Sequence, residues 1–315
     1  MDIKRFLKDW TLLISMVCGV LAYFVYTSIP CLVPTRAFAH HLVAILQPLL
    51  IFSMLFITFC KVDPHSLRLR RWHLWLLLLQ LVAFSLLAAL LILMPDLPGR
   101  VVVEGAMLCF ICPTATAAAV ITAKLGGDAA GLATYTVLIN LTTAVAVPLF
   151  FPLVHPHSDL GFWASFFLIV GKVFPMLICP FFMAMLVRWL VPRFHQAVVG
   201  CRDLAFYLWA ISLSIAIAMT TRSMVHANVP WPYQAGIAAA SLFACVLQFY
   251  LGHVIGRRCG SPISAGQALG QKNTVLAIWM GYTFLTPVTA LAGGFYSIWH
   301  NVYNSWQLYR KGLRK

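Results

Sequence analysis

Long apolar stretches alternate with short polar or charged connections along the whole chain. A helix that spans a bilayer needs about 20 mostly apolar residues. Such stretches lie near residues 10–30, 40–60, 73–95, 102–123, 129–153, 162–190, 204–221, 234–256, 263–285 and 288–308. The pattern therefore predicts ten transmembrane helices, numbered here in this order, in an all-α polytopic membrane protein. The connections leave no room for a soluble domain.

Composition supports this class. Hydrophobic residues make up 62% of the chain and charged residues 10%, against about 45–50% and about 25% in soluble domains. So few charges could not cover the apolar surface of a soluble fold, which excludes an ordinary soluble enzyme, a disordered protein and a secreted disulfide scaffold. The nine cysteines are scattered and are expected to pack as small hydrophobes. We expect no metal site, since Cys109 and Cys112 form a C-x-x-C pair without a second pair.

The basic residues follow the predicted topology. With the N-terminus in the cytoplasm, 17 of the 22 Lys and Arg residues fall on the inner side and 3 on the outer side, while Lys172 and Lys272 lie within spans. Such an imbalance is typical of cytoplasmic loops. It predicts that both termini are cytoplasmic and accounts for the net charge of +14 without a nucleic-acid partner. Short loops and the absence of a targeting signal favour a bacterial inner membrane.

Two of the ten spans are interrupted by polar or helix-breaking residues. The fourth contains Pro113 among small residues at 112–119, and the ninth contains glycines and polar side chains at 266–274. They occupy corresponding places in two halves of five spans, near 1–155 and 158–315. Because five is odd, the second half would be inverted relative to the first. Interruptions at matching positions indicate a transporter site, and the N-terminal ends of half-helices favour an anion.

The interrupted segments carry a family resemblance. Residues 112–120 read C-P-T-A-T-A-A-A-V, close to C-P-G-G-T-A-S-N-V, and residues 268–274 read A-L-G-Q-K-N-T, close to E-V-G-M-Q-N-S. In the tenth span, residues 296–301 read Y-S-I-W-H-N, close to F-S-V-W-H-N. With these motifs the chain resembles the bile acid:sodium symporter family over its whole length.

The resemblance implies two inverted five-helix repeats in which the fourth and ninth helices cross. It also implies a core domain of helices 3–5 and 8–10 and a panel domain of helices 1, 2, 6 and 7. The substrate would bind in the cleft between them, beside the crossing. The expected substrate-binding residues are Thr114, Thr116, Asn273, Thr274, His300 and Asn301.

The departures from the family motifs concern the sodium sites. Ala268 stands where the family has an acidic residue, Ala118 and Ala119 stand where it has Ser-Asn, and Lys272 replaces a glutamine. Hard cations require oxygen ligands, so these positions are lost as sodium ligands. The polar residues that remain as candidates for ion coupling are Gln80, Thr136, Asn140 and Gln271, besides Thr116 and Asn273. We expect no sodium binding in the family manner and no cofactor.

Lys272 is the main titratable residue inside the predicted spans. Placing a lysine at the middle of a membrane helix costs about 2.5–3.5 kcal/mol on insertion scales. We therefore expect Lys272 either to bond to a partner inside the protein or to have a function in transport. Its ammonium could replace a sodium ion, or it could load and release a proton during transport. The third alternative is a structural lysine bonded to Gln80 and nearby carbonyls.

These residues favour a secondary transporter of a small organic anion that is not sodium-coupled. The alternative on the same fold is a membrane sensor or binding protein that does not transport. An intramembrane enzyme is disfavoured, because the chain has only 8 acidic residues and none clusters with a histidine in a span. The expected partners are the anion and the lipid bilayer.

Overall fold

The computed structural model describes residues 11–156, 160–201, 203–226 and 229–313, and this part of the chain folds into helices without a β-strand. The helices are α2 (Thr11–Ser28), η1 (Pro30–Thr35), α3 (Arg36–Cys60), η2 (Pro64–Ser66), α4 (Arg71–Leu93), α5 (Arg100–Ile111), α6 (Ala118–Leu125), α7 (Ala129–Val154), α8 (Phe162–Leu177), α9 (Cys179–Leu190), α10 (Pro192–Gly200), α11 (Leu204–His226), α12 (Trp231–Arg258), α13 (Pro262–Gly270), α14 (Thr274–Phe284) and α15 (Leu291–Gly312).

Six helical segments in the described part of the chain are long and apolar enough to cross a membrane: Pro30–Cys60, Arg71–Leu93, Ala129–Val154, Phe162–Leu190, Leu204–His226 and Trp231–Arg258. Their outward side chains are large and apolar, as Leu78, Phe167 and Phe243 show with more than half of their surface exposed. These features support an integral multi-pass membrane protein. Helices also occupy the other four predicted segments. In the first of them the described residues Ile14–Ser28 form a shorter apolar helix, the tenth is occupied by α15, and the fourth and ninth segments are each split into two short helices.

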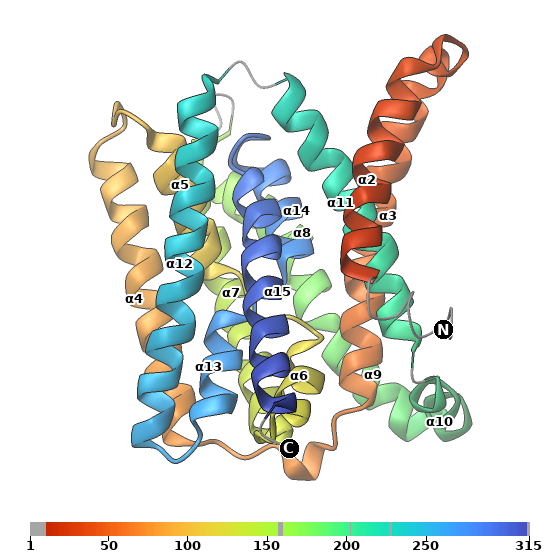
Figure 1. The fold of residues 1–315 in the computed structure, drawn as a ribbon, viewed down its shortest axis with the longest axis vertical. Coiled ribbons are helices and arrows are strands. Elements are labelled where there is room, and N and C mark those ends of the chain that lie inside the picture. Colours follow the sequence, from red (N-terminus) through yellow and green to blue (C-terminus); the bar gives the residue numbers. More distant parts are fainter. Residues whose placement is uncertain (1–10, 157–159, 202, 227–228, 314–315) are drawn as a thin grey trace.

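The helices form two groups that stand side by side (Figure 1). In one group α2, α3, α9 and α11 pack on one another, and in the other α12 packs against α4, α5, α13 and α15 while α7 packs against α4. The groups meet where α11 contacts α14 and α15. They also meet where α7 contacts α8, which packs against α3 and α9 of the first group. The two split segments, α5–α6 and α13–α14, both belong to the second group.

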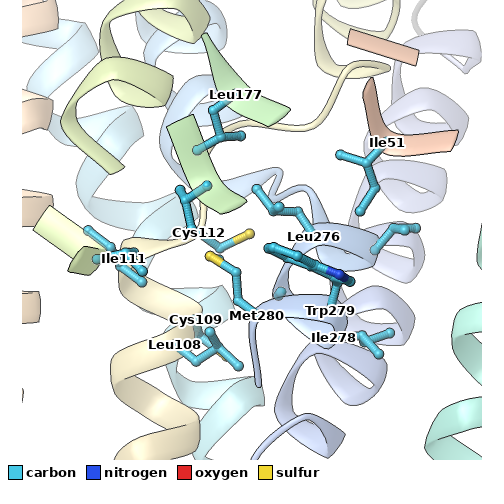
Figure 2. Close-up of a cluster of buried hydrophobic side chains, with 14 of the residues drawn as sticks. Ile51, Leu108, Cys109, Ile111, Cys112, Leu177, Leu276, Ile278, Trp279 and Met280 are labelled. Carbon is cyan, nitrogen blue, oxygen red and sulfur yellow. The ribbon is translucent and has the colours of Figure 1, made fainter. Parts of the chain in front are cut away.

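An apolar core surrounds the ends of the split helices. Figure 2 shows Ile111 and Cys112 at the end of α5 next to Leu276 and Met280 of α14, with the sulfur atoms of Cys112 and Met280 at the centre of the cluster. Leu177, at the end of α8, packs into the same cluster. The chain therefore breaks two helices inside its most apolar region, where free backbone groups are costly.

Several basic connections lie at one end of the bundle. Arg70 pairs with Asp128 at 2.6 Å, Arg188 lies 3.7 Å from Asp63, and Lys311 donates to the carbonyl of Lys124. We call this the basic end; it also carries the C-terminal part of α15 (Figure 1). The alternation of charge along the sequence predicted that these loops share one side.

Candidate functional site

The fourth and ninth predicted segments break at the positions that the sequence indicated. In the fourth, α5 ends at Ile111 and α6 begins at Ala118; in the ninth, α13 ends at Gly270 and α14 begins at Thr274. Pro113 has no N–H to donate and disfavours helical backbone in the residue before it. Accordingly Cys112 leaves the helical region, with ψ 129°.

The two breaks pair with each other. Thr114 and Lys272 face one another in an isolated antiparallel bridge. On either side of it, the N–H of Ala115 donates to the carbonyl of Gln271 at 2.9 Å, and the N–H of Asn273 donates to the carbonyl of Pro113 at 2.8 Å. The interrupted segments thus satisfy the backbone groups that a continuous helix would have paired internally.

Side chains from separate elements cap the carbonyl end of α5. Four consecutive carbonyls each accept a hydrogen bond from a different side chain. The donors are Gln248 Nε2 to Cys109 (3.4 Å), Lys272 Nζ to Phe110 (3.5 Å), Thr143 Oγ1 to Ile111 (3.0 Å) and Gln80 Nε2 to Cys112 (3.2 Å). The C-terminal end of a helix carries partial negative charge, so an ammonium is favourable there.

The carbonyl end of α13 is capped in the same way. The hydroxyl of Thr114 donates to the carbonyl of Ala268 at 2.7 Å, and the hydroxyl of Tyr296 donates to the carbonyl of Gly270 at 2.8 Å. Carbonyls at the ends of broken helices can otherwise coordinate a cation. Here the carbonyls of Ala268 and Gly270 accept hydrogen bonds from protein side chains instead.

Lys272 lies at the centre of this arrangement. Its side chain is 1% exposed, its ammonium reaches the carbonyl of Phe110, and its electrostatic neighbours are the thiols of Cys112, Cys109 and Cys245. Among the described residues, no carboxylate lies within ion-pairing distance of its Nζ. The buried carboxylate of Glu104 binds Arg100, His155 and Thr289 instead, near the end of the bundle opposite the basic end.

The expectation that a structural Lys272 would bond to Gln80 is wrong. The amide of Gln80 donates to the carbonyl of Cys112, and its Oε1 accepts from the hydroxyl of Tyr135 at 3.0 Å. Gln80 therefore holds the break of the fourth segment against α4 and α7. The carbonyl half of that expectation is confirmed, because Lys272 bonds to Phe110.

The other residues expected to bind substrate occupy different environments. Asn273 directly precedes α14 and caps it, because its side-chain oxygen accepts the N–H of Leu276, and Thr274 follows in a buried position. Thr116 lies in the half-exposed part of the first break. In α15, His300 is buried with Nδ1 unpartnered, whereas Asn301 donates to the carbonyl of Ser297 in its own helix.

The remaining ion-coupling candidates do not form an oxygen cage. Thr136 donates to the carbonyl of Leu132 within α7, while both polar atoms of the Asn140 side chain are buried and unpartnered. The three lost ligand positions carry methyl groups only: Ala118 and Ala268 are fully buried and Ala119 is half-buried. Among these candidates, Asn140 Oδ1 and Gln271 Oε1 are buried side-chain oxygens without a hydrogen-bond partner, and neither carries the charge of a carboxylate.

Three residues that cap the breaks were missed in the sequence. Gln248 is an isolated polar residue in an apolar stretch, and that isolation is a signal that could have identified it, whereas Thr143 and Tyr296 lie beside other polar residues and carry no such signal. A polar side chain within a span faces the protein interior and finds a partner there.

The fold and the paired breaks together define an all-helical, multi-pass membrane protein with two interrupted helices bonded to each other. No protein-family model and no curated protein matches the chain. Its function is therefore inferred from the chemistry of the paired breaks.

Proposed function

We propose that this protein is a secondary transporter of a small organic anion that works by alternating access without sodium coupling, similar to the bile acid:sodium symporters. The N-terminal ends of α6 and α14 begin directly after the two paired breaks. Helix N-termini attract anions through free N–H groups and the helix dipole. The half-exposed Thr116 and the adjacent Ala117 give a ligand access to this region.

The proposal that transport is independent of sodium rests on the hydrogen bond between Lys272 Nζ and the carbonyl of Phe110. The ammonium lies against the carbonyl end of α5, where the helix dipole favours a cation. We assign Lys272 as a built-in cation that keeps the crossing in its binding-competent shape. Transport would then need no coupling ion, or would be coupled to protons if Lys272 loses and regains its proton.

The finer architecture belongs to the same proposal. Ten membrane helices would form two inverted five-helix repeats, 1–155 and 158–315, with the basic end and both termini in the cytoplasm of a bacterium. Helices 3–5 and 8–10 would be the core and helices 1, 2, 6 and 7 the panel. The interruption of the fourth and ninth segments and the clustering of basic loops support this arrangement.

A thermal-shift screen of small organic anions, with and without sodium, tests the proposal on the purified protein. At least one anion should raise Tm equally in sodium-containing and sodium-free buffer, because the cation is part of the chain. Lys272→Gln should abolish this shift. The matched control is Lys172→Gln, since Lys172 is exposed on α8 and lies 6.0 Å from the ring of Phe284. A strict sodium requirement would overturn the proposal.

Uptake into proteoliposomes distinguishes the two roles of Lys272. With a fixed ammonium, uptake of the anion in sodium-free buffer should not change when a pH gradient is imposed. With a proton switch, a gradient should drive accumulation, and Lys272→Gln should remove that response.

A sensor or binding protein on the same fold is the second candidate. The donors that cap α5 and α13 come from the protein itself, so the site is held together without a coupling ion that would drive movement. An anion that raises Tm but never crosses the liposome membrane would favour this alternative.

A further inference from the structure

Buried polar side chains line the contact between α13 and α15. Gln267 and Gln271 lie four residues apart on and just after α13, and Ser297, His300 and Asn304 follow one face of α15. Each of the five is at most 4% exposed. We call this set the α13–α15 seam. Both helices belong to the second group.

Every residue of the seam has a polar side-chain atom without a protein partner. These atoms are Gln267 Oε1, Gln271 Oε1, Ser297 Oγ, His300 Nδ1 and Asn304 Nδ2. A buried polar atom that makes no hydrogen bond has lost its water without compensation, so such atoms are rare in native interiors. Five of them along one seam indicate that something small and polar lies between the two helices.

Direct hydrogen bonds fix the register of the seam. The amide of Gln267 donates to Asn304 Oδ1 at 3.0 Å and to Gln307 Oε1 at 2.7 Å, and Tyr296 donates to the carbonyl of Gly270. Because the helices run in opposite directions, Gln271 lies level with the start of the seam on α15. The seam therefore runs from Gln307, which is half-exposed toward the basic end, to the residue before Lys272.

The groups that face this inner end link the seam to Lys272. The ring of His300 packs edge-on against Tyr296, and the hydroxyl of Tyr296 interacts with Gln248 and with the thiol of Cys245. The side-chain amide of Gln248 also donates to the carbonyl of Cys109, which directly precedes the Phe110 carbonyl that Lys272 binds. Uncharged donors and acceptors thus continue from the seam to the lysine.

We propose that water fills the α13–α15 seam and forms a route for protons between the basic end and Lys272. Neutral amide, hydroxyl and imidazole groups that both donate and accept hydrogen bonds suit water, which needs two to four such partners. A proton would pass from hydronium along the waters to the amine, leaving water behind, and the reverse transfer would return it. The route is separate from the anion site at α6 and α14.

Cysteine accessibility tests the seam without any substrate. Ser297→Cys and Asn304→Cys, each in the full chain in lipid nanodiscs, are treated with aminoethyl methanethiosulfonate, and the modified peptide is quantified by mass spectrometry. Both cysteines should react several-fold faster than Ala144→Cys, which is equally buried but lies in the apolar core beside Thr143. Adding Asn304→Leu to Ser297→Cys should slow the reaction at position 297.

The outcomes separate the seam from the transport proposal. If cysteines at 297 and 304 react no faster than the cysteine at 144, the seam is dry and the inference is wrong. If either Ser297→Cys or Asn304→Cys does not elute as a folded species in size-exclusion chromatography, the labelling rate of the other variant tests the seam. The labelling experiment requires no anion, so it tests the seam independently of transport. If the cysteines in the seam react rapidly but the protein transports no anion, the proposed function is wrong and the hydrated seam stands.

Discussion

Thr114 and Lys272 face each other across one antiparallel bridge, and each caps the half-helix that precedes the other. The hydroxyl of Thr114 donates to Ala268 of α13, and the ammonium of Lys272 donates to Phe110 of α5. The two breaks are therefore mutually dependent: a change in one leaves a carbonyl of the other unpaired. This reciprocity makes the crossing a single unit.

Thr114→Val should destabilise the protein through α13. Valine keeps the shape of threonine but leaves the buried carbonyl of Ala268 without its donor, at a cost of about 1–2 kcal/mol. SDS-induced unfolding in mixed micelles measures the change. The matched control is Thr142→Val, because the hydroxyl of Thr142 bonds to Leu138 within its own helix and its loss should change little. Equal effects of the two substitutions would argue against reciprocal capping.

Lys272→Met should separate the functional from the structural role of the lysine. Methionine is similarly long but uncharged, so it removes an insertion cost of about 2.5–3.5 kcal/mol and leaves the carbonyl of Phe110 without one donor. We expect Tm to be unchanged or raised while the anion-induced shift disappears. A variant that unfolds would instead identify Lys272 as a structural residue.

The hydrophobic pattern predicted the positions of the breaks because Pro113, Gly270 and Lys272 are unfavourable inside a lipid-facing helix, whatever packs around them. The ends of the helices confirm these positions. The crossing of the fourth and ninth helices is implied by the family resemblance and not by the hydrophobic pattern; the bridge between Thr114 and Lys272 shows that the two breaks lie against each other.

The donors at the breaks could not be read from the sequence. Gln248 lies 139 residues from Cys109, and Thr143 lies 32 residues from Ile111. Such pairs are set by how the helices pack, and hydropathy carries no information about which polar side chain reaches which carbonyl. For the same reason the sequence allowed a bond between Gln80 and Lys272 as one of three alternatives, although the packing of α4 on α5 directs Gln80 to Cys112.

Glu104→Gln should loosen the end of the bundle opposite the basic end. The buried carboxylate of Glu104 accepts from Arg100 at 2.9 Å, from His155 at 3.1 Å and from Thr289 at 2.9 Å, so it ties α5 to α7 and to the loop before α15. Removing its charge leaves Arg100 without a counter-charge, which should cost about 3 kcal/mol of unfolding free energy.

The control for this change is an exposed ion pair. Asp63 lies 3.7 Å from Arg188, and both side chains are well exposed, so Asp63→Asn should cost less than about 1 kcal/mol. Both variants are compared by SDS-induced unfolding at low and high salt. Salt should reduce only the effect of Asp63→Asn, and a salt-sensitive Glu104→Gln would mean that its carboxylate is solvated.

Gly270→Ala should disrupt the crossing by steric overlap. A Cβ at position 270 would overlap the ring of Phe249, which is 2% exposed and packs against Tyr303 with ring centroids 4.3 Å apart. The ring has no free space to move into, so overpacking should cost about 1–3 kcal/mol and shift the carbonyl that Tyr296 binds. Gly171→Ala is the control, since nothing lies within 4 Å of a Cβ there and alanine should raise helix stability by up to about 1 kcal/mol. The apparent Tm of the two variants should therefore move in opposite directions, and a tolerated alanine at 270 would show that the end of α13 is not held as tightly as the capping bonds imply.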